Sequence, residues 1–423
     1  MGDKRVAVVN LGCRVNRVES DRFIAELHRA GFELVDERDA DVIVINTCAV
    51  TGEAESKTRK AVRHALKMPL APMVVATGCA VNLNPVAIAA LSDRVVVEPS
   101  KLDVPRRVEE LLPDRGCASD DAEGHGFIDL LGRSRLGVKI QDGCNHRCTY
   151  CIVWKARGPE RSVPVGDVVG QVRSAAEAGV PEIVLTGVNL GAYCSVDGGS
   201  TIGIDGLVER LLAETSIPQI RLSSIEPMDV SRPLIDCMAS SSRIAPFLHL
   251  PLQSGCDSTL RRMARPYTSG DFLGLVHDIR RSVPSVSLSC DIIVGFPGET
   301  EEEFEESLET CRAAGFSRMH VFRYSKRPGT PAAAARDQVP PSVMVRRSAR
   351  MRALALELAL EDSRRRVGSV ETCVLESGHA GTLASFHHVE IDGPCELSAG
   401  SLARVAIDDV DRDGVLHAHL CDR

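Results

Sequence analysis

Three closely spaced cysteines carry the clearest chemical signature in the sequence. The stretch GCNHRCTYC at 143–151 places Cys144, Cys148 and Cys151 at the spacing CxxxCxxC. A structural zinc site usually has four ligands, and the local sequence offers no fourth one. An iron–sulfur cluster held by three thiolates keeps one iron open for a small-molecule ligand. A chain with 15 cysteines could hold such a triple by chance, but the dense setting QDGCNHRCTYC favours a cluster.

A second set of cysteines follows three predicted strands. Cys13 stands in LGCRVN, Cys48 in INTCAV and Cys79 in ATGCAV. The strands that precede them are predicted at 4–10, 41–46 and 72–77. The carboxyl ends of parallel strands meet at one edge of a sheet, where ligands bind. Cysteines are often simply small buried apolar residues, but three at equivalent positions favour a second three-thiolate site.

The elements that position these cysteines alternate between strand and helix. Besides the three strands, the N-terminal region has a strand at 94–97 and helices at 16–30, 52–67, 84–91 and 103–112. This βα order predicts a parallel sheet with helices on both faces. The polar, Gly-rich stretch 113–126 has the composition of a linker.

Beyond the linker, the pattern predicts a partial (β/α)6 barrel with its active site at the carboxyl ends of the strands. Its strands are predicted at 136–140, 181–186, 219–223, 247–252, 287–294 and 317–323. Helices are predicted between them at 166–178, 204–213, 231–241, 256–263, 271–282 and 300–314. The strand-end loops supply the candidate cofactor-binding residues, together with one tyrosine of the cysteine loop and one arginine. These residues are Tyr150, Gly187, Asn189, Ser224, Glu226, Gln253 and Arg265.

Charged helices and a β-rich tail follow the barrel strands. The helix predicted at 341–366 carries arginines at 346, 347, 350 and 352. Two interpretations stay open for it, a solvated face or contact with phosphates. Of Arg261, Arg262 and Arg265, we expect at least one to meet substrate or cofactor. The segment 367–423 reads as a small all-β module, a barrel of five strands.

Composition limits the class of protein. At 423 residues the chain is long enough for two or three domains. Its net charge of −8 argues against a globally basic nucleic-acid-binding surface. The sequence has no signal-peptide pattern and no apolar run of about 18 residues, so no membrane span is expected. Fifteen cysteines in such a chain fit metal-bound thiolates in a reducing cytoplasm.

Along nearly its whole length the chain resembles the radical S-adenosylmethionine methylthiotransferases. The matching stretches are LGCRVN, NTCAVTGEAE, TGCAV, QDGCNHRCTYCIVWKARGPERS, TGVNLGAY, RLSSIEP, HLPLQSG, DIIVGFPGET and VFRYSKRPGTPAA. Their combination in this order is specific. The resemblance implies a methylthiotransferase N-terminal domain at 1–112, a linker at 113–126, a radical barrel at 127–366 and a TRAM-like β module at 367–423.

The resemblance also implies two 4Fe–4S clusters and S-adenosylmethionine as cofactors. Cys144, Cys148 and Cys151 would hold the catalytic cluster, where S-adenosylmethionine is cleaved reductively to a radical that removes hydrogen from an unreactive C–H bond. The three strand-end cysteines would hold the auxiliary cluster, which carries the sulfur that becomes methylated. Such chemistry belongs to the cofactors, and it needs an electron donor such as flavodoxin or ferredoxin and a sulfur source.

The substrate branch follows from three of these stretches. NTCAVTGEAE, RLSSIEPMDV and VFRYSKRPGTPAA look most like the enzymes that modify N6-threonylcarbamoyladenosine next to the tRNA anticodon, at carbon 2. Sister branches modify isopentenyladenosine in tRNA or an aspartate of a ribosomal protein. A non-catalytic iron–sulfur or zinc RNA-binding protein is the alternative from another class. Two separate three-cysteine sites argue against it.

Two features depart from the family pattern. Ile152-Val153-Trp154 stands where the family usually has a Pro–Tyr pair, so Trp154 has stacking on adenine and ordinary packing as candidate roles. The terminal module is short and has few of the aromatic and basic residues that RNA binding uses. We interpret the remaining nine cysteines as structural. They are Cys117, Cys194, Cys237, Cys256, Cys290, Cys311, Cys373, Cys395 and Cys421.

Overall fold

The computed structural model of the chain describes residues 4–49, 52–112, 133–393 and 396–421, and the linker predicted at 113–126 lies outside them. The chain divides into two compact units. The first comprises Met1–Leu131, Asp142–Glu160 and Ser325–Ala333, and the second comprises Gly132–Gln141, Arg161–Tyr324 and Ala334–Arg423. The CxxxCxxC loop therefore belongs to the same unit as the N-terminal sheet. The domain boundaries at 112, 126 and 366 stay predictions.

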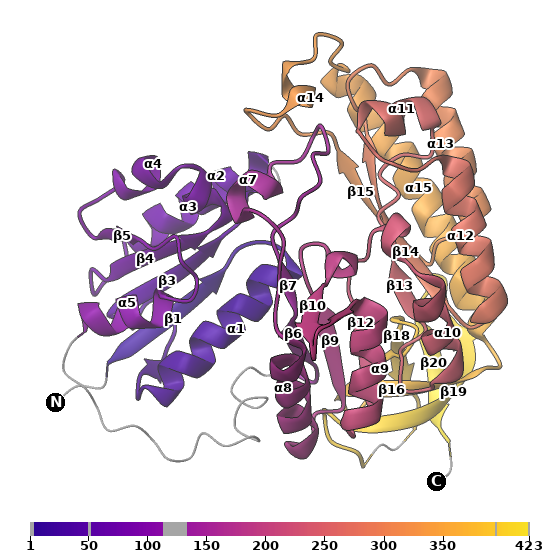
Figure 1. Cartoon of the computed structure of the whole chain (residues 1–423), viewed down its shortest axis with the longest axis horizontal. Coiled ribbons are helices and arrows are strands. Elements are labelled where there is room, and N and C mark those ends of the chain that lie inside the picture. Colours follow the sequence, from indigo (N-terminus) through magenta and orange to yellow (C-terminus); the bar gives the residue numbers. More distant parts are fainter. Residues whose placement is uncertain (1–3, 50–51, 113–132, 394–395, 422–423) are drawn as a thin grey trace. The chain divides into compact units, whose positions relative to one another are not determined.

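A five-stranded parallel sheet forms the centre of the first unit (Figure 1). Its order is β2-β1-β3-β4-β5, with β1 at Arg5–Asn10, β2 at Glu33–Leu34, β3 at Val42–Thr47, β4 at Met73–Gly78 and β5 at Val95–Val97. The helices are α1 (Arg14–Arg29), α2 (Gly52–Ala65), α3 (Cys79–Leu83), α4 (Pro85–Ala89), α5 (Val104–Leu111) and α7 (Val153–Arg157). The predicted parallel sheet is confirmed. The two-residue β2 was too short for the sequence pattern to reveal.

Apolar side chains cover both faces of this sheet. On one face, Phe23 and Leu27 of α1 pack against Val42 of β3. On the other face, Ile43 of β3 packs with Val62 of α2. Successive residues of a strand point to opposite faces, so the uninterrupted apolar run of β3 supplies both cores. Strands buried on both faces are typical of parallel sheets covered by helices.

Six parallel strands form the barrel of the second unit. They are β6 (Leu136–Lys139), β9 (Glu182–Thr186), β12 (Gln219–Leu222), β13 (Phe247–His249), β14 (Ser287–Val294) and β15 (Arg318–Arg323). They pair as β12-β9-β6 and β13-β14-β15. A parallel bridge between Ser224 and His249 joins the two sets. The predicted partial (β/α)6 barrel is confirmed.

Helices cover the outside of this barrel (Figure 1). They are α8 (Val165–Glu177), α9 (Ile204–Glu214), α10 (Arg232–Ser240), α11 (Asp257–Arg262), α12 (Ser269–Ser282), α13 (Glu301–Ala314) and α15 (Pro341–Arg366). Shorter elements are β7 (Gln141–Asp142), β8 (Arg161–Ser162), β10 (Ser195–Asp197), β11 (Ser200–Ile202), α14 (Pro331–Ala334) and 3-10 turns at Leu190–Ala192 and Pro227–Asp229. The β10–β11 hairpin turns at Gly198 and Gly199, both with positive φ. An Asp-Gly-Gly turn is a hairpin signal that could have revealed it.

The strand predicted at 247–252 is wrong at its carboxyl end, because β13 stops at His249. The backbone N–H of Leu250 still donates to the carbonyl oxygen of Ser289, at 2.8 Å. Pro251 has no N–H to donate, and Gln253 has a φ of 67°. The chain therefore leaves the regular ladder after His249, and Gln253 contacts β14 again only through an isolated parallel bridge with Ile292.

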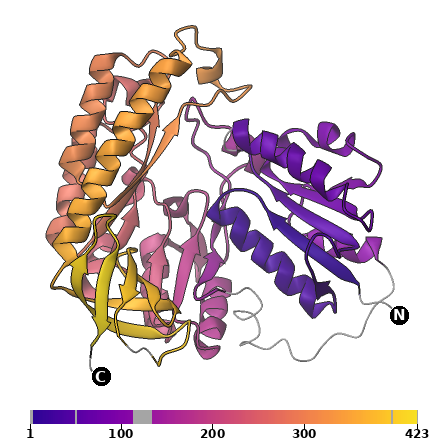
Figure 2. The ribbon, with the colours of Figure 1, turned by 180° about the vertical axis from the view of Figure 1, so that it is seen from behind.

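The last five strands close into a small barrel, which confirms the predicted β module. In the order β16-β17-β18-β20-β19 they span Val370–Ser377, Ala380–Leu383, His388–Ile391, Leu416–Leu420 and Leu402–Val410. Leu375, Val389 and Val405 belong to its apolar core. Figure 2 shows this barrel in yellow beside the end of α15, which contacts β19.

Arg221 of β12 holds the small barrel against the six-stranded one. Its fully buried guanidinium donates to both carboxylate oxygens of Glu182, at 2.7 and 2.8 Å. It also donates to the carbonyl oxygens of Leu383 and Ala384, at 3.2 and 2.8 Å. The ring of Phe386 lies 4.9 Å from the guanidinium carbon. One buried cation thus satisfies acceptors from both barrels.

Replacing Arg221 with methionine is expected to lower the free energy of unfolding by about 3–5 kcal/mol, because Glu182 loses its partner while it stays buried. Urea unfolding followed by circular dichroism measures this. Arg232 of α10 is the matched control, since its side chain is 57% exposed, and Arg232→Met should change the free energy by no more than about 0.5 kcal/mol. Equal effects of the two substitutions would contradict the prediction.

Candidate active site

The three strand-end cysteines lie at the carboxyl edge of the five-stranded sheet. Cys13 precedes the first turn of α1, Cys48 follows β3, and Cys79 begins α3 directly after β4. The parallel register sets Thr47 opposite Gly78, so the residues immediately before Cys48 and Cys79 are neighbours. The structure therefore places the three cysteines on adjacent strand ends of one edge, as the sequence predicted.

Two glycines allow a close approach of the backbone at this edge. Gly12 has a φ of 125°, and a Cβ atom there would lie 2.9 Å from the sulfur of Cys48. Gly78 has a φ of 98°, and a Cβ atom there would lie 2.4 Å from the carbonyl oxygen of Thr47. Residues other than glycine are strained at such φ values. The glycines that precede Cys13 and Cys79 thus bring both loops against the end of β3.

Asn16 ties the loops at this edge together. Its side-chain nitrogen donates to the carbonyl oxygens of Leu11, at 3.0 Å, and of Thr47, at 2.8 Å. The side-chain nitrogen of Asn46 in turn donates to the carbonyl oxygen of Asn16, at 2.9 Å. Asn16 is fully buried. Asn16 is not among the site residues predicted from the sequence, although its position three residues after Cys13 in LGCRVN could have indicated it.

The CxxxCxxC loop is closed at its base by hydrogen bonds. The N–H of Cys144 donates to the carbonyl oxygen of Gly158, at 3.1 Å. The N–H and side-chain nitrogen of Asn145 donate to the carboxylate of Glu160, at 3.1 and 3.0 Å. The N–H of Val153 points at the sulfur of Cys151, at 3.4 Å. Donors aimed at cysteine sulfur are among the groups that tune iron–sulfur clusters.

The segment Ser325–Ala333 supports the same loop. The N–H of Ala332 donates to the carbonyl oxygen of Thr149, at 2.9 Å, and Lys155 donates to the carbonyl oxygen of Gly329, at 2.9 Å. The guanidinium of Arg147 lies 3.9 Å from the centroid of the Trp154 ring. Trp154 thus contacts Arg147 and Lys155 of the same loop, and its two candidate roles stay predictions.

Arg157 connects this loop to the edge with the other cysteines. One of its terminal nitrogens donates to Glu19 and to Asp142, both at 2.9 Å. The other donates to the side-chain oxygen of Asn16, at 2.6 Å. Lys101 forms an ion pair with the same Glu19. Arg157 is therefore the residue through which the two cysteine sets share one buried polar network.

Two cations lie beside Cys79 in this network. Burial would lower the pKa of Arg157, but the Cys79 thiolate, Glu19 and Asp142 outweigh it and raise the pKa well above its usual value. For Lys101, burial and the neighbouring Arg157 lower the pKa, against the opposing effects of Glu19 and Cys79. Both side chains therefore lie within electrostatic range of a cysteine that is predicted to hold the auxiliary cluster.

These residues fit the clusters that the sequence predicts. Each set supplies three thiols, soft ligands suited to iron–sulfur clusters. The Cys151 sulfur has a backbone donor, and Cys79 has two cationic neighbours. A cluster with several thiolate ligands is negatively charged, so both features would stabilise it. The donor chemistry thus suits two clusters in the first unit.

Six of the seven predicted cofactor-binding residues lie in the second unit, and Tyr150 lies in the first, within the cysteine loop. Arg265 forms an ion pair with Glu226, and its Nε donates to the hydroxyl of Tyr267, at 3.1 Å. Tyr267 itself donates to the carbonyl oxygens of Pro251 and Leu252, at 2.9 and 3.1 Å. The structure thus brings Glu226 and Arg265 together and anchors them close to Gln253.

Gln141 organises the loop that holds Gly187 and Asn189. Its side-chain oxygen accepts hydrogen bonds from the N–H groups of Val188 and Asn189, both at 2.9 Å. A Cβ atom at Gly187 would lie 3.0 Å from the Cβ of Gln141. Gln141 is fully buried. Gln141 is not among the site residues predicted from the sequence, although it stands three residues before Cys144 in QDGC.

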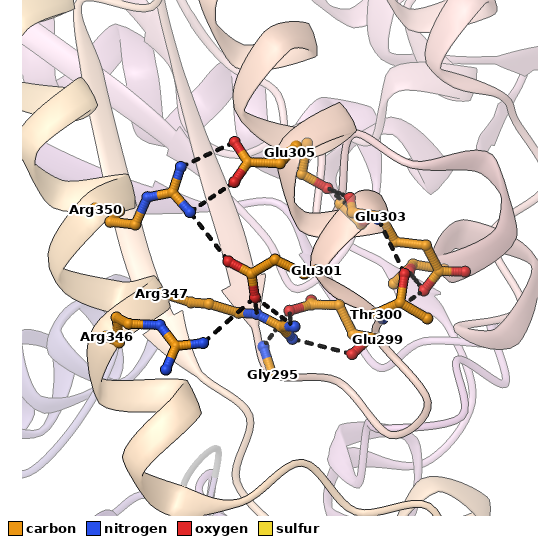
Figure 3. Close-up of polar contacts among 12 residues, drawn as sticks. Gly295, Glu299, Thr300, Glu301, Glu303, Glu305, Arg346, Arg347 and Arg350 are labelled. Atoms are coloured by element: carbon orange, nitrogen blue, oxygen red, sulfur yellow. Dashed lines mark hydrogen bonds and ion pairs between the residues drawn. The ribbon is translucent and has the colours of Figure 1, made fainter.

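Three arginines of α15 pair with glutamates of α13 and of the loop just before it (Figure 3). Arg347 donates to the side chain of Glu299, at 2.7 Å, and to Glu301, at 3.0 Å. Arg350 pairs with Glu301 and Glu305, at 3.1 and 2.6 Å. Burial raises the pKa of Glu299, against the opposing effect of the Gly295 N–H and Arg347. Neither of the two interpretations of this helix included these ion pairs, in which Arg347 and Arg350 pair with glutamates of the same chain.

Replacing Arg347 with leucine is expected to cost about 3 kcal/mol of unfolding free energy, because it leaves buried Glu299 without its cation. Arg350 serves as the control, because its side chain is 42% exposed and exposed pairs contribute under about 1 kcal/mol. Thermal unfolding of the two variants beside the parent protein measures the difference. A loss in Arg350→Leu as large as that in Arg347→Leu would contradict the prediction.

The other described cysteines are mostly buried. Cys290 and Cys311 are completely buried, and burial raises the pKa of both thiols. Cys373 lies in the core of the small barrel. A buried neutral thiol is chemically inert, which agrees with a structural role. Cys117 and Cys395 lie outside the described residues.

Two family models match the chain. The model of the Radical SAM superfamily matches residues 138–311, which include the CxxxCxxC loop and most of the six-stranded barrel. The model of the Uncharacterized protein family UPF0004 matches residues 5–97, which include the five-stranded sheet and its three strand-end cysteines. Each three-cysteine set thus falls within one matched region.

Curated relatives match the chain over most of its length. The threonylcarbamoyladenosine tRNA methylthiotransferase MtaB of Chlamydia pneumoniae is 33% identical over 97% of this chain and 96% of the relative. The MtaB protein of Bacillus subtilis is 36% identical over 84% of this chain and 81% of the relative. The tRNA-2-methylthio-N(6)-dimethylallyladenosine synthase of Nocardioides sp. is 34% identical over 94% of this chain and 85% of the relative.

A solved structure supports the fold. The radical S-adenosylmethionine methyltransferase TsrM from Kitasatospora setae, with cobalamin and a [4Fe-4S] cluster bound, aligns with a TM-score of 0.55 at 15% identity. The alignment covers 78% of this chain and 77% of that chain. In the part of the chain that the structure describes, no helix is both long and apolar enough to cross a membrane.

The two matched regions and the full-length relatives agree with each other. A radical SAM region joined to this N-terminal family calls for S-adenosylmethionine and two 4Fe–4S clusters. The chain is therefore an enzyme that combines sulfur insertion with methyl transfer. It belongs to the radical S-adenosylmethionine methylthiotransferase family.

Proposed function

We propose that this enzyme acts on tRNA and inserts a methylthio group at carbon 2 of N6-threonylcarbamoyladenosine next to the anticodon. The 33% identity over 97% of the chain to a tRNA methylthiotransferase named for this substrate carries the proposal as far as a tRNA methylthiotransferase. Overall identity alone does not separate the branches, because the dimethylallyladenosine synthase of Nocardioides sp. is 34% identical. The choice rests on NTCAVTGEAE, RLSSIEPMDV and VFRYSKRPGTPAA.

In this proposal the cysteines divide into two sets with different tasks. Cys144, Cys148 and Cys151 hold the cluster with the open iron for S-adenosylmethionine, and the strand-end set holds the auxiliary cluster. The bound cofactors supply radical generation and sulfur transfer. The chain positions the cysteine ligands. Asn16 and the glycines before Cys13 and Cys79 fix the strand-end edge of the sheet. The hydrogen bonds of Cys144 and Asn145 close the CxxxCxxC loop.

The second unit binds S-adenosylmethionine in this proposal. The carboxylate of Glu226 is 20% exposed beside Arg265, so it can still accept hydrogen bonds from a cationic amine. The backbone at Gly187 and the side-chain amide of Asn189 lie on the loop that Gln141 holds by hydrogen bonds. The enzyme further needs an electron donor such as flavodoxin or ferredoxin and a sulfur source, and the proposed location is the cytoplasm.

Mass spectrometry of nucleosides from total tRNA tests the substrate. A strain that lacks this gene should lose 2-methylthio-N6-threonylcarbamoyladenosine, accumulate the unmodified nucleoside, and recover the product when the gene is restored. Restoration with a Cys144→Ala variant should fail. Loss of the methylthio derivative of isopentenyladenosine instead would assign the enzyme to the sister branch. Unchanged tRNA with an unmodified ribosomal aspartate would assign it to the protein-modifying branch.

A further inference from the structure

Two histidines and an aspartate stand together in the six-stranded barrel. His249 of β13, Asp291 of β14 and His320 of β15 each offer one ligand atom, and these atoms lie within 4.8 Å of one another. Within the described residues, no other set of three histidine, cysteine, aspartate or glutamate side chains meets this distance. All three residues belong to the second unit, apart from the cysteine sets.

The strand register explains why the three side chains meet. His249 pairs with Ser289, and Asp291 pairs with His320. Ser289 and Asp291 are two residues apart on β14, so they share one face of the sheet. The intervening Cys290 is fully buried and close to Cys311 of α13, so its side chain faces the outer helices. The face that carries the histidines and the aspartate is therefore the inner face of the barrel.

The ring of His249 is oriented as a metal ligand would be. Its Nδ1 lies 2.8 Å from the hydroxyl oxygen of Ser289, and its Nε2 lies 3.3 Å from a carboxylate oxygen of Asp291. Histidines that bind metals usually have the other ring nitrogen fixed by a hydrogen bond. Ligand atoms that share one zinc ion at about 2.1 Å lie roughly 3–3.5 Å from each other. The Nε2–carboxylate spacing falls in that range.

The charge of Asp291 is available to a cation. No lysine or arginine among the described residues forms an ion pair with it. The contrast is Asp362, which faces His387 at 3.1 Å and also pairs with Arg365 and Arg366. The side chain of Asp291 is 30% exposed and His320 is exposed, so an ion can reach the site from solvent.

We propose that His249, Asp291 and His320 bind one divalent cation that accepts nitrogen and oxygen ligands, with Zn²⁺ as the first candidate. Three protein ligands leave a coordination position open for a further oxygen ligand. The site adjoins the proposed cofactor-binding residues, since Ser224 bridges to His249 and the N–H of Gln253 donates to the carbonyl oxygen of Asp291, at 2.8 Å. The proposal does not depend on which substrate the enzyme modifies.

Metal analysis of the cluster-loaded enzyme tests the site. Protein reconstituted with iron and sulfide is equilibrated with buffered Zn²⁺, passed through a desalting column, and analysed for both metals in one sample. We expect one zinc per chain without loss of iron. Asp291→Asn and His320→Gln should lose the zinc and keep the iron. Ser289→Ala should bind zinc about 10–100-fold more weakly, because it removes only the partner of the His249 ring.

His419 supplies the matched control. It lies 2.7 Å from Asp408 on the small barrel, where both side chains are about half exposed, and it forms a pair rather than a set of three. His419→Gln should keep the zinc, and circular dichroism confirms that each variant is folded. Zinc that stays in Asp291→Asn and His320→Gln would overturn the proposal. If zinc increased only as iron decreased, the zinc would be bound at the cysteines, and the proposal would be overturned. A parent enzyme that retains no zinc would also overturn the proposal.

Discussion

Replacing Cys144, Cys148 and Cys151 together with alanine is expected to remove about four of the roughly eight irons of the reconstituted enzyme and to abolish cleavage of S-adenosylmethionine. In the proposed division of tasks these three thiolates would hold the open iron that binds S-adenosylmethionine, and the iron would be lost with them. Iron analysis after anaerobic reconstitution and chromatography of the cleavage products measure both effects. The expected loss of cleavage is complete, because the other three-cysteine set carries the sulfur in the proposed division of tasks and does not cleave S-adenosylmethionine.

The other cysteine set gives the matched comparison. Replacing Cys13, Cys48 and Cys79 should also remove about four irons, but it should spare cleavage of S-adenosylmethionine and stop methylthio transfer to the substrate. Cys311→Ala is a control for the loss of any cysteine, because that thiol is completely buried and belongs to the second unit, whereas both sets belong to the first. Cleavage that survived in the first triple variant, or iron that remained in it, would refute the division of tasks between the sets.

Several parts of this arrangement could be predicted because they depend on local patterns. The runs VIVINT and MVVATG are apolar on both faces, which is typical of buried parallel strands. Once the strands are placed, Cys13, Cys48 and Cys79 must lie at the same edge, since parallel strands share their direction. The helix Pro341–Arg366 was predicted with the same bounds, because proline marks its start and Val367-Gly368 its end.

Other parts could not be predicted, because they depend on which residues meet across the fold. Sequence spacing did not decide whether Arg347 and Arg350 lie on a solvated face or contact phosphates, and it did not indicate that the packing of α15 on α13 pairs them with Glu299, Glu301 and Glu305. The group of His249, Asp291 and His320 depends on the register of three strands separated by long helical segments. A shift of one residue in the strand register would place these side chains on opposite faces of the sheet.

Arg157 is the clearest example of a residue whose contacts could not be predicted from the sequence, since 138 residues separate it from Glu19. Replacing Arg157 with methionine is expected to lower the free energy of unfolding by about 3 kcal/mol, because Glu19 stays buried with one cation instead of two. It should also lower the reduction potential of the auxiliary cluster by on the order of 50 mV, since a positive charge beside Cys79 favours the reduced, more negative cluster. Urea unfolding and redox titration followed by electron paramagnetic resonance measure the two effects.

The conservative substitution Arg157→Lys distinguishes the effect of the positive charge from the effect of side-chain packing. Arg157→Lys keeps a cation beside Cys79 but cannot reach Glu19, Asp142 and Asn16 at once, because an ammonium lacks the planar fork of a guanidinium. We therefore expect it to restore most of the potential and little of the stability. Arg106→Met, on the exposed side of α5, should leave the potential unchanged. If the lysine and methionine variants shifted the potential equally, the charge of Arg157 would not tune the cluster, and its role would be to hold the cysteine loop in place.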